Sequence, residues 1–272
     1  ALAPSGLIAV LLVAACAPSS DAPVGNAAEN EAAARYADRM AGTPPPAPPS
    51  KPFAVKESSG GLEFAYAYPA EAAAVPALVD KFARDMAATK ADALKMAKED
   101  SAAAKESGYP FRPHSLETEW SVAANTPRFL ALQSQTYVYT GGAHGMTGYD
   151  AVLWDKARKQ ESSVKALMTS PAAFSTAIRD RFCAILDQQR AEKRGAPVVR
   201  GDDDFTQCID PMEQVLVPTS KDGKLIDGLT VVVSPYSAGP YAEGSYEVAL
   251  PVDAAMRNAI KPDYREAFVG LK

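Results

Sequence analysis

Residues 128–145 read RFLALQSQTYVYTGGAHG, and this stretch decides how the chain around it folds. Its first twelve residues alternate as a strand with two different faces requires. One face holds Leu130, Leu132, Thr136 and Val138, and the other holds Gln133, Gln135, Tyr137 and Tyr139. The glycines that follow are typical of a tight connection, because glycine adopts positive φ without steric cost. The stretch therefore predicts a long strand that ends in a sharp turn.

Neighbouring segments give this strand its partners. Residues 115–123 are long enough to pair with it as a hairpin around a turn at residues 124–127. Residues 149–154 continue the sheet after the glycine-rich connection. Residues 62–68 alternate large and small side chains, which predicts a further strand that Pro69 ends.

Two longer helices are predicted beside these strands. After residue 69 an apolar face recurs at intervals of three and four residues, and an alanine-rich, mostly solvated stretch continues this helix to Lys105. Ser170 and Pro171 indicate the start of the second helix, as its N-cap and first helical residue. The inward positions are Val75, Leu78, Val79, Phe82 and Met86 in the first helix, and Phe174, Ile178, Phe182 and Ile185 in the second.

The last third returns to strands and ends in a short helix. Asp222 and Gly223 suit a tight turn between two of these strands. The strands are residues 213–218, 228–233 and 246–250, and the helix lies between residue 251 and Pro262. Strands and helices are segregated rather than alternating, which favours an α+β fold. We predict a mainly antiparallel sheet packed with two longer helices and one short C-terminal helix.

Composition limits the class of protein. Of the 272 residues, 47% are hydrophobic and 8% are aromatic, which is too apolar for a largely disordered chain. The 28 Lys and Arg against 33 Asp and Glu leave a net charge of −5, so the chain lacks the basic excess of most nucleic-acid binders. We expect a folded domain with no nucleic-acid partner.

The N-terminal residues predict export and lipidation. Residues 6–15, GLIAVLLVAA, are uncharged and too short to span a bilayer as a helix, which suits the apolar region of a signal peptide. The sequence VAAC at residues 13–16 resembles a lipobox, whose cysteine is lipidated. We expect residues 1–15 to be a signal peptide, truncated at its start, and Cys16 to carry a lipid. The alternative is a cleaved secretory signal with an incidental cysteine.

The domain organisation follows from this assignment. Residues 16–52 form the lipidated cysteine and a proline-rich tether, and residues 53–272 form the folded domain, with subregions of about 53–125 and 126–272. We expect the domain to lie in the cell envelope, on the periplasmic side, with the membrane as a partner through the lipid. Ala17, rather than an aspartate, follows the cysteine and favours the outer membrane.

Two cysteines remain, Cys183 and Cys208. An exported protein with two thiols most simply pairs them, so we predict a disulfide bond. The alternative is two unpaired buried thiols.

The chain offers few of the usual catalytic motifs. Its two histidines are His114 and His144, and HExxH, GxSxG and the phosphate-binding glycine loop are all missing from the sequence. We expect no catalytic residue, no metal and no cofactor. The alternative is a cell-wall or ester hydrolase that uses His144 with a nearby Ser, Asp or Glu.

Two segments rich in glycine and tyrosine are the candidates for recognition. The first is the turn after residue 136, and the second is residues 233–244, VSPYSAGPYAEG. Tyrosine combines a rigid apolar ring with a polar tip, which suits a recognition surface and also the corner of a strand. His144 either anchors its loop through the backbone or faces a ligand. The candidate binding residues are Tyr137, Tyr139, Gly141, Gly142, His144, Tyr236, Tyr241 and Gly244.

Together, YTGGAHG at residues 139–145 and SPY…AGPYAEG at residues 234–244 resemble a known pair of motifs. Over roughly residues 53–271, the chain resembles the RsiV-like extracytoplasmic domain family, including the non-catalytic N-terminal region of PdaC-type deacetylases and uncharacterised bacterial envelope lipoproteins. The resemblance implies an α+β domain outside a membrane, and in RsiV-type anti-sigma factors that domain binds lysozyme. The sigma-factor-binding segment and the deacetylase module are not found in this sequence, so neither activity is carried over.

The expected function is that of a non-enzymatic, lipid-anchored periplasmic module for binding or sensing. Its ligand is expected to be a protein, such as a lysozyme-type hydrolase, or the glycan of peptidoglycan, bound by the two candidate segments. The alternatives are the hydrolase that uses His144 and a structural envelope lipoprotein.

Overall fold

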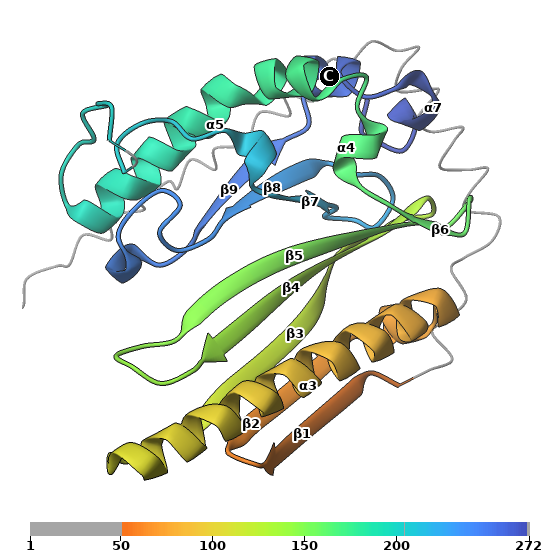
Figure 1. The fold of residues 1–272 in the computed structure, drawn as a ribbon. Coiled ribbons are helices and arrows are strands. Elements are labelled where there is room, and N and C mark those ends of the chain that lie inside the picture. Colours follow the sequence, from red (N-terminus) through yellow and green to blue (C-terminus); the bar gives the residue numbers. More distant parts are fainter. Residues whose placement is uncertain (1–50, 204, 271–272) are drawn as a thin grey trace, which may run out of the picture.

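The computed structural model describes residues 51–203 and 205–270, so the predicted signal peptide, the predicted lipid attachment at Cys16 and nearly all of the predicted tether lie outside the described residues. The described chain forms two sheets and two long helices (Figure 1). Helix α3 (Pro76–Ser107) lies on one side of the first sheet, while the second sheet and helix α5 (Pro171–Arg194) lie on the other. None of the described helices combines the length and the apolar character that crossing a bilayer requires.

The first sheet has six strands in the order β1-β2-β3-β4-β5-β6. The pair β2 and β3 is parallel, because α3 carries the chain from the end of one strand back to the start of the other. The other neighbouring strands are antiparallel. The strands are β1 (Phe53–Ser59), β2 (Leu62–Tyr68), β3 (His114–Asn125), β4 (Phe129–Tyr139), β5 (Met146–Asp155) and β6 (Gln160–Ser162).

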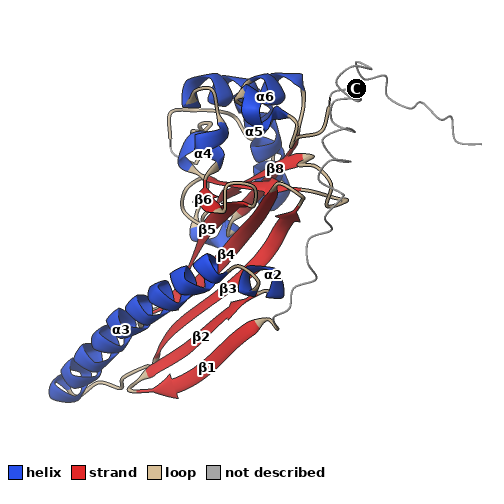
Figure 2. Ribbon diagram, turned by 90° about the vertical axis from the view of Figure 1, so that its right-hand side faces the viewer, coloured by secondary structure: helices blue, strands red, loops and turns tan. Residues whose placement is uncertain are grey.

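Helix α3 runs along one face of this sheet (Figure 2), after the short helix α2 (Ala70–Ala73). Leu78 and Phe82 are buried against the strands, as the spacing predicts. The alanine-rich continuation also buries Ala93 and Ala97, although most of its other side chains are exposed. Small side chains at these positions leave room for the helix to approach the sheet closely.

The second sheet has three antiparallel strands in the order β7-β8-β9. Strand β7 contacts β3, β4 and β5 of the first sheet, and α5 packs along β9. The second layer therefore covers only part of the first sheet. Its elements are α4 (Val164–Leu167), α5, the 3-10 turns η1 (Pro211–Glu213) and η2 (Tyr241–Glu243), β7 (Val215–Thr219), β8 (Gly228–Val233), β9 (Tyr246–Pro251), α6 (Ala254–Asn258) and α7 (Pro262–Arg265).

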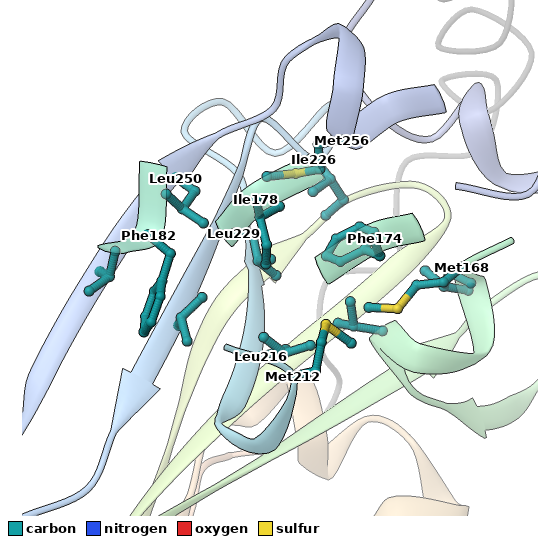
Figure 3. Packing of buried hydrophobic residues seen from close by; sticks show 14 of the residues in the cluster. Met168, Phe174, Ile178, Phe182, Met212, Leu216, Ile226, Leu229, Leu250 and Met256 are labelled. Atoms are coloured by element: carbon teal, nitrogen blue, oxygen red, sulfur yellow. The ribbon is translucent and has the colours of Figure 1, made fainter. Parts of the chain in front are cut away.

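Two apolar cores result from this arrangement, one on each side of the first sheet. The core under α3 contains Leu130 and Leu132 of β4. The core under α5 contains Phe129 and Ala131 of the same strand, together with the α5 and second-sheet residues that Figure 3 shows. The first half of β4 is therefore buried on both faces, while Gln135 and the residues after it keep one face open.

The predicted fold class, the β3–β4 hairpin, both long helices and the turn at Gly223 are confirmed. Strand β1 was not predicted, and the late strands form a sheet of their own. The strand expected from residue 213 begins at Val215, because Asp210 caps a 3-10 turn before it. In α5, Leu186 is fully buried and Ile185 only partly, since Leu186 follows Phe182 by four residues. The division near residue 125 stays a prediction.

The predicted disulfide is present between Cys183 of α5 and Cys208, with 5.5 Å between the two Cα atoms. It ties the loop after α5 back to the middle of that helix. Arg190, about two helical turns after Cys183, donates to the carbonyl of Gln207 beside the second cysteine at 2.9 Å. The disulfide and this hydrogen bond fix the same segment.

We predict that replacing Cys183 and Cys208 by Ser lowers the free energy of unfolding by about 3–4 kcal/mol, because the unfolded chain regains the entropy of an open loop. Urea unfolding of the variant and of the oxidised wild-type protein measures this difference. The control Cys16→Ser, outside the folded domain, leaves the unfolding free energy unchanged. A loss below about 1 kcal/mol in the double variant would contradict the prediction.

Candidate functional site

The two predicted recognition segments lie against each other. The imidazole of His144, in the β4–β5 loop, stacks on the ring of Tyr241 in the β8–β9 loop, with 3.7 Å between ring centroids and 15° between planes. Tyr236 lies beside Tyr241 at a centroid distance of 5.7 Å. His144 is exposed, Tyr236 is 48% exposed and Tyr241 is partly exposed. We call these three rings the aromatic platform.

The β4–β5 loop owes its shape to glycines and to Arg112. Gly141 and Gly142 have φ angles of 94° and 84°, the conformation that the sequence predicts for this turn. The Tyr139 hydroxyl donates to the Gly142 carbonyl at 3.2 Å, and an Arg112 guanidinium nitrogen donates to the same oxygen at 3.2 Å. These two bonds hold the loop back against the end of β4.

Gly145 has a different role, since it lies under the ring of Tyr137. A methyl group at Gly145 would overlap that ring, so only glycine permits this packing. The neighbouring His144 has its Nδ1 atom 3.0 Å from the Gly145 carbonyl oxygen. Tyr137 therefore supports the backbone that carries the exposed imidazole.

The β8–β9 loop is held by cations from the last turns of α5. Arg194 binds the Glu243 carboxylate with two nitrogens, at 2.8 and 3.0 Å. The Lys193 ammonium donates to the carbonyls of Glu243 and Ser245, at 2.5 and 2.6 Å. The buried Arg190 donates through Nε to the Ala238 carbonyl at 2.8 Å. Three side chains of one helix thus fix the loop at three points.

Glu243 is the centre of this arrangement, because the Tyr246 hydroxyl also donates to its carboxylate. Burial acts to raise the pKa of Glu243, but its hydrogen bonds to Arg194 and Tyr246 outweigh burial and hold the pKa below its ordinary value. Burial, together with the bond to Glu243, raises the pKa of Tyr246 to about 12. Glu243 therefore remains ionised at any pH above its ordinary range, and its hold on the loop persists there.

One residue of the platform has a strained backbone; among the described non-glycine residues, the other with positive φ is Lys159 in the β5–β6 turn. Tyr236 has φ 68°, in the left-handed region that a bulky residue rarely adopts. Such conformations cost about 1–3 kcal/mol and persist where the surrounding contacts impose them. Here the strained residue also exposes its ring to solvent, so burial of the ring does not account for the strain.

Of the predicted binding residues, the structure brings together His144, Tyr236 and Tyr241. Four others shape the first loop: Tyr137, Tyr139, Gly141 and Gly142. Gly244, with φ 65°, ends the second loop. Five further residues shape these loops and were not predicted from the sequence: Arg112, Arg190, Lys193, Arg194 and Glu243. A basic turn at a helix C-terminus is common, and nothing in its spacing indicates which loop it will bind.

The other histidine lies elsewhere in the fold. His114 begins β3, is buried, and has its Nε2 atom 3.1 Å from a carboxylate oxygen of Asp100 in α3. Across residues 51–203 and 205–270, no group of three His, Cys, Asp or Glu side chains could hold a metal ion. Among the same residues, no serine or carboxylate forms a hydrogen bond with His144, whose contacts are the Gly145 carbonyl and the Tyr241 ring.

Residues 55–147 match the family model described as deacetylase PdaC, which confirms the predicted resemblance for this segment. The chain is also similar to the crystal structure of a DUF3298 family protein from Pseudomonas aeruginosa PAO1, with 14% identity, a TM-score of 0.47, and coverage of 82% of this chain and 98% of that one. A DUF3298 family member from Bacteroides fragilis NCTC 9343 shows 16% identity, a TM-score of 0.47, and coverage of 79% and 94%. No curated protein matches the chain.

We predict that Glu243→Gln lowers the free energy of unfolding by about 1–3 kcal/mol, because it breaks a partly buried ion pair whose remaining partner stays in the fold. The matched control is Arg200→Gln, which removes an exposed ion pair with Asp187 and costs less than about 1 kcal/mol. Thermal and urea unfolding at neutral pH compare the two variants. Equal losses would show that Glu243 does not hold the loop.

Proposed function

We propose that this domain is a lipid-anchored periplasmic binding module and that the aromatic platform binds the glycan of peptidoglycan. The single observation that supports this most is the exposed, stacked arrangement of His144, Tyr236 and Tyr241 on two loops that other residues hold in place. Preorganised loops reduce the entropy that a ligand must overcome on binding.

The chemistry of the platform favours a sugar ligand. A pyranose ring presents a face of C–H groups beside a rim of hydroxyls, and tyrosine offers an apolar face beside a polar tip. The hydroxyl of Tyr236 and the Nε2 atom of His144 can hydrogen-bond a ligand at the edges of the rings, since His144 Nδ1 already contacts the Gly145 carbonyl. Aromatic rings on a rigid support also suit a protein ligand, so a lysozyme-type hydrolase is the alternative outcome of the test.

The anchor belongs to the same proposal. The apolar residues 6–15 and Cys16 support export and lipidation, and the proline-rich residues that follow would hold the domain away from the lipid surface. The disulfide fits an oxidising compartment. A domain tethered in this way meets peptidoglycan at high effective concentration.

We predict that Tyr236→Gly and Tyr241→Ala each lower the affinity for soluble peptidoglycan fragments at least about tenfold, because each removes a ring from the platform. For Tyr236→Gly the stability stays within about 1 kcal/mol of wild type, since glycine adopts the left-handed backbone without strain. Isothermal titration calorimetry and thermal unfolding measure the two effects.

The matched control is Tyr109→Ala, which removes a tyrosine that is 55% exposed just after α3 and leaves affinity unchanged. Lysozyme is titrated in parallel. Binding of lysozyme without binding of glycan would overturn the glycan assignment in favour of a protein ligand. Binding of neither would overturn the proposed function.

We also predict that Cys16→Ala releases the protein from the membrane fraction, because a lipidated cysteine is the anchor in this proposal. Expression with an intact signal peptide, followed by fractionation and metabolic labelling with a fatty acid, measures attachment. Persistent labelling of the variant, or a wild-type protein found in the soluble fraction, would contradict the anchor.

A further inference from the structure

The face of the first sheet turned away from α3 is open beyond the second layer. Cross-strand partners place its side chains in two rows that run across five strands. One row is Lys56, Ala65, Glu117, Tyr137 and Thr147, and the other is Ala54, Ala67, Glu119, Gln135 and Tyr149. Both rows lead from the edge strand β1 to β5, beside the candidate site.

Alanine occupies three neighbouring positions of this face, at residues 54, 65 and 67. Alanine is depleted in strands, and an open strand face more often carries larger β-branched or polar side chains. The three alanines form the floor of a groove of about 480 Å³, with Lys56 on one side and Glu117 and Glu119 on the other. The backbones of β1 and β3 that flank it lie about 10 Å apart, the spacing of two strand intervals.

Two carboxylates line this groove without an internal partner. Glu117 and Glu119 are exposed, and among the described residues neither forms an ion pair or a side-chain hydrogen bond. Being two residues apart in one strand, they point to the same face. The cations of the face are Lys56 across the groove and Arg112 at its far end, where Arg112 already binds the Gly142 carbonyl. The carboxylates therefore remain free to accept hydrogen bonds from a ligand.

The groove continues to the aromatic platform. Tyr137 lines the groove and also packs on Gly145, the residue next to His144. Tyr149, in the second row, donates to Ser245 of the β8–β9 loop at 2.9 Å. A ligand that leaves the platform along the sheet therefore meets Tyr137 and then the carboxylates.

The chemistry of the groove argues against an added strand as its occupant. The backbone groups of β2 and β3 are already paired with strands on both sides, so binding there depends on side chains. A flat floor of methyl groups beside carboxylate and amide acceptors suits a chain of sugar rings whose substituents donate hydrogen bonds. Ionised donors such as ammonium groups form stronger hydrogen bonds with carboxylates than neutral donors do.

We infer that the groove binds an extended glycan strand that bears free amino groups and that continues from the aromatic platform. This inference rests on the proposed function, because the platform positions the strand. It assigns a second part of the site, with Glu117 and Glu119 as the residues that recognise the amino groups.

The test uses the folded domain and two β-1,4-linked hexamers, one of glucosamine and one of N-acetylglucosamine, at mildly acidic pH where the amines are charged. The wild-type protein is expected to bind the glucosamine hexamer about tenfold more tightly, the effect of charge-assisted hydrogen bonds. The double variant Glu117→Gln/Glu119→Gln is expected to bind both hexamers equally. The control Glu99→Gln/Glu106→Gln, with the same change of charge on exposed positions of α3, keeps the difference.

A second variant tests the groove itself. Ala65→Leu/Ala67→Leu fills the floor of the groove with larger side chains that strands accept. This variant is expected to bind the glucosamine hexamer no more tightly than the glucosamine dimer. Its affinity for the dimer is expected to equal that of the wild-type protein. The inference would be overturned if the wild-type protein bound the two hexamers equally, or if neither groove variant changed binding. In that case, glycan binding that Tyr241→Ala abolishes would still support the proposed function. Tighter binding of a lysine-rich peptide than of the glucosamine hexamer would also overturn it. Absence of any glycan binding would overturn both.

Discussion

The burial of β4 on both faces is the constraint on which the rest of the structure depends. Leu130 and Leu132 belong to the core under α3, while Phe129 and Ala131 belong to the core under α5. A slip of this strand by one residue would move each set of side chains into the opposite core, where the packing does not fit it. Its register also fixes where Tyr137 and Tyr139 emerge from the covered part of the sheet, and hence where the β4–β5 loop begins.

The second layer covers only the first half of this strand, and that incomplete cover creates the candidate site. Where β7 and the α5 core end, the open face of the sheet begins, and the β8–β9 loop lies at the boundary. Within this loop Ala238 is buried in the core under α5, and cations from α5 hold the part of the loop that leaves the core. A site on loops that a rigid scaffold positions is the common arrangement in binding proteins.

Local periodicity explains why much of the fold could be predicted. The alternation in β4 and the apolar face of α5, with its Ser170 N-cap, are properties of the nearby sequence. The pairing of strands that are far apart in the sequence is not such a property: the parallel pairing of β2 with β3 depends on a connection through the whole of α3. In the candidate site, the glycines and aromatic residues could be predicted from their residue type alone. Arg194 and Glu243 are 49 residues apart, and only the packing of α5 brings them together.

On the open face of the sheet, the small size of three side chains points to a groove that no sequence motif indicates. Ala54, Ala65 and Ala67 contribute little to stability on an exposed face, and larger strand-forming residues would fit there. Their position beside two unpaired carboxylates, in rows that end at the platform, is what a ligand-binding groove requires of the sheet. Tyr236, at the other end of this surface, also lowers the local stability of the fold, because its backbone is strained. Both ends of this surface depart from what folding alone favours, and the proposed ligand binding would account for both.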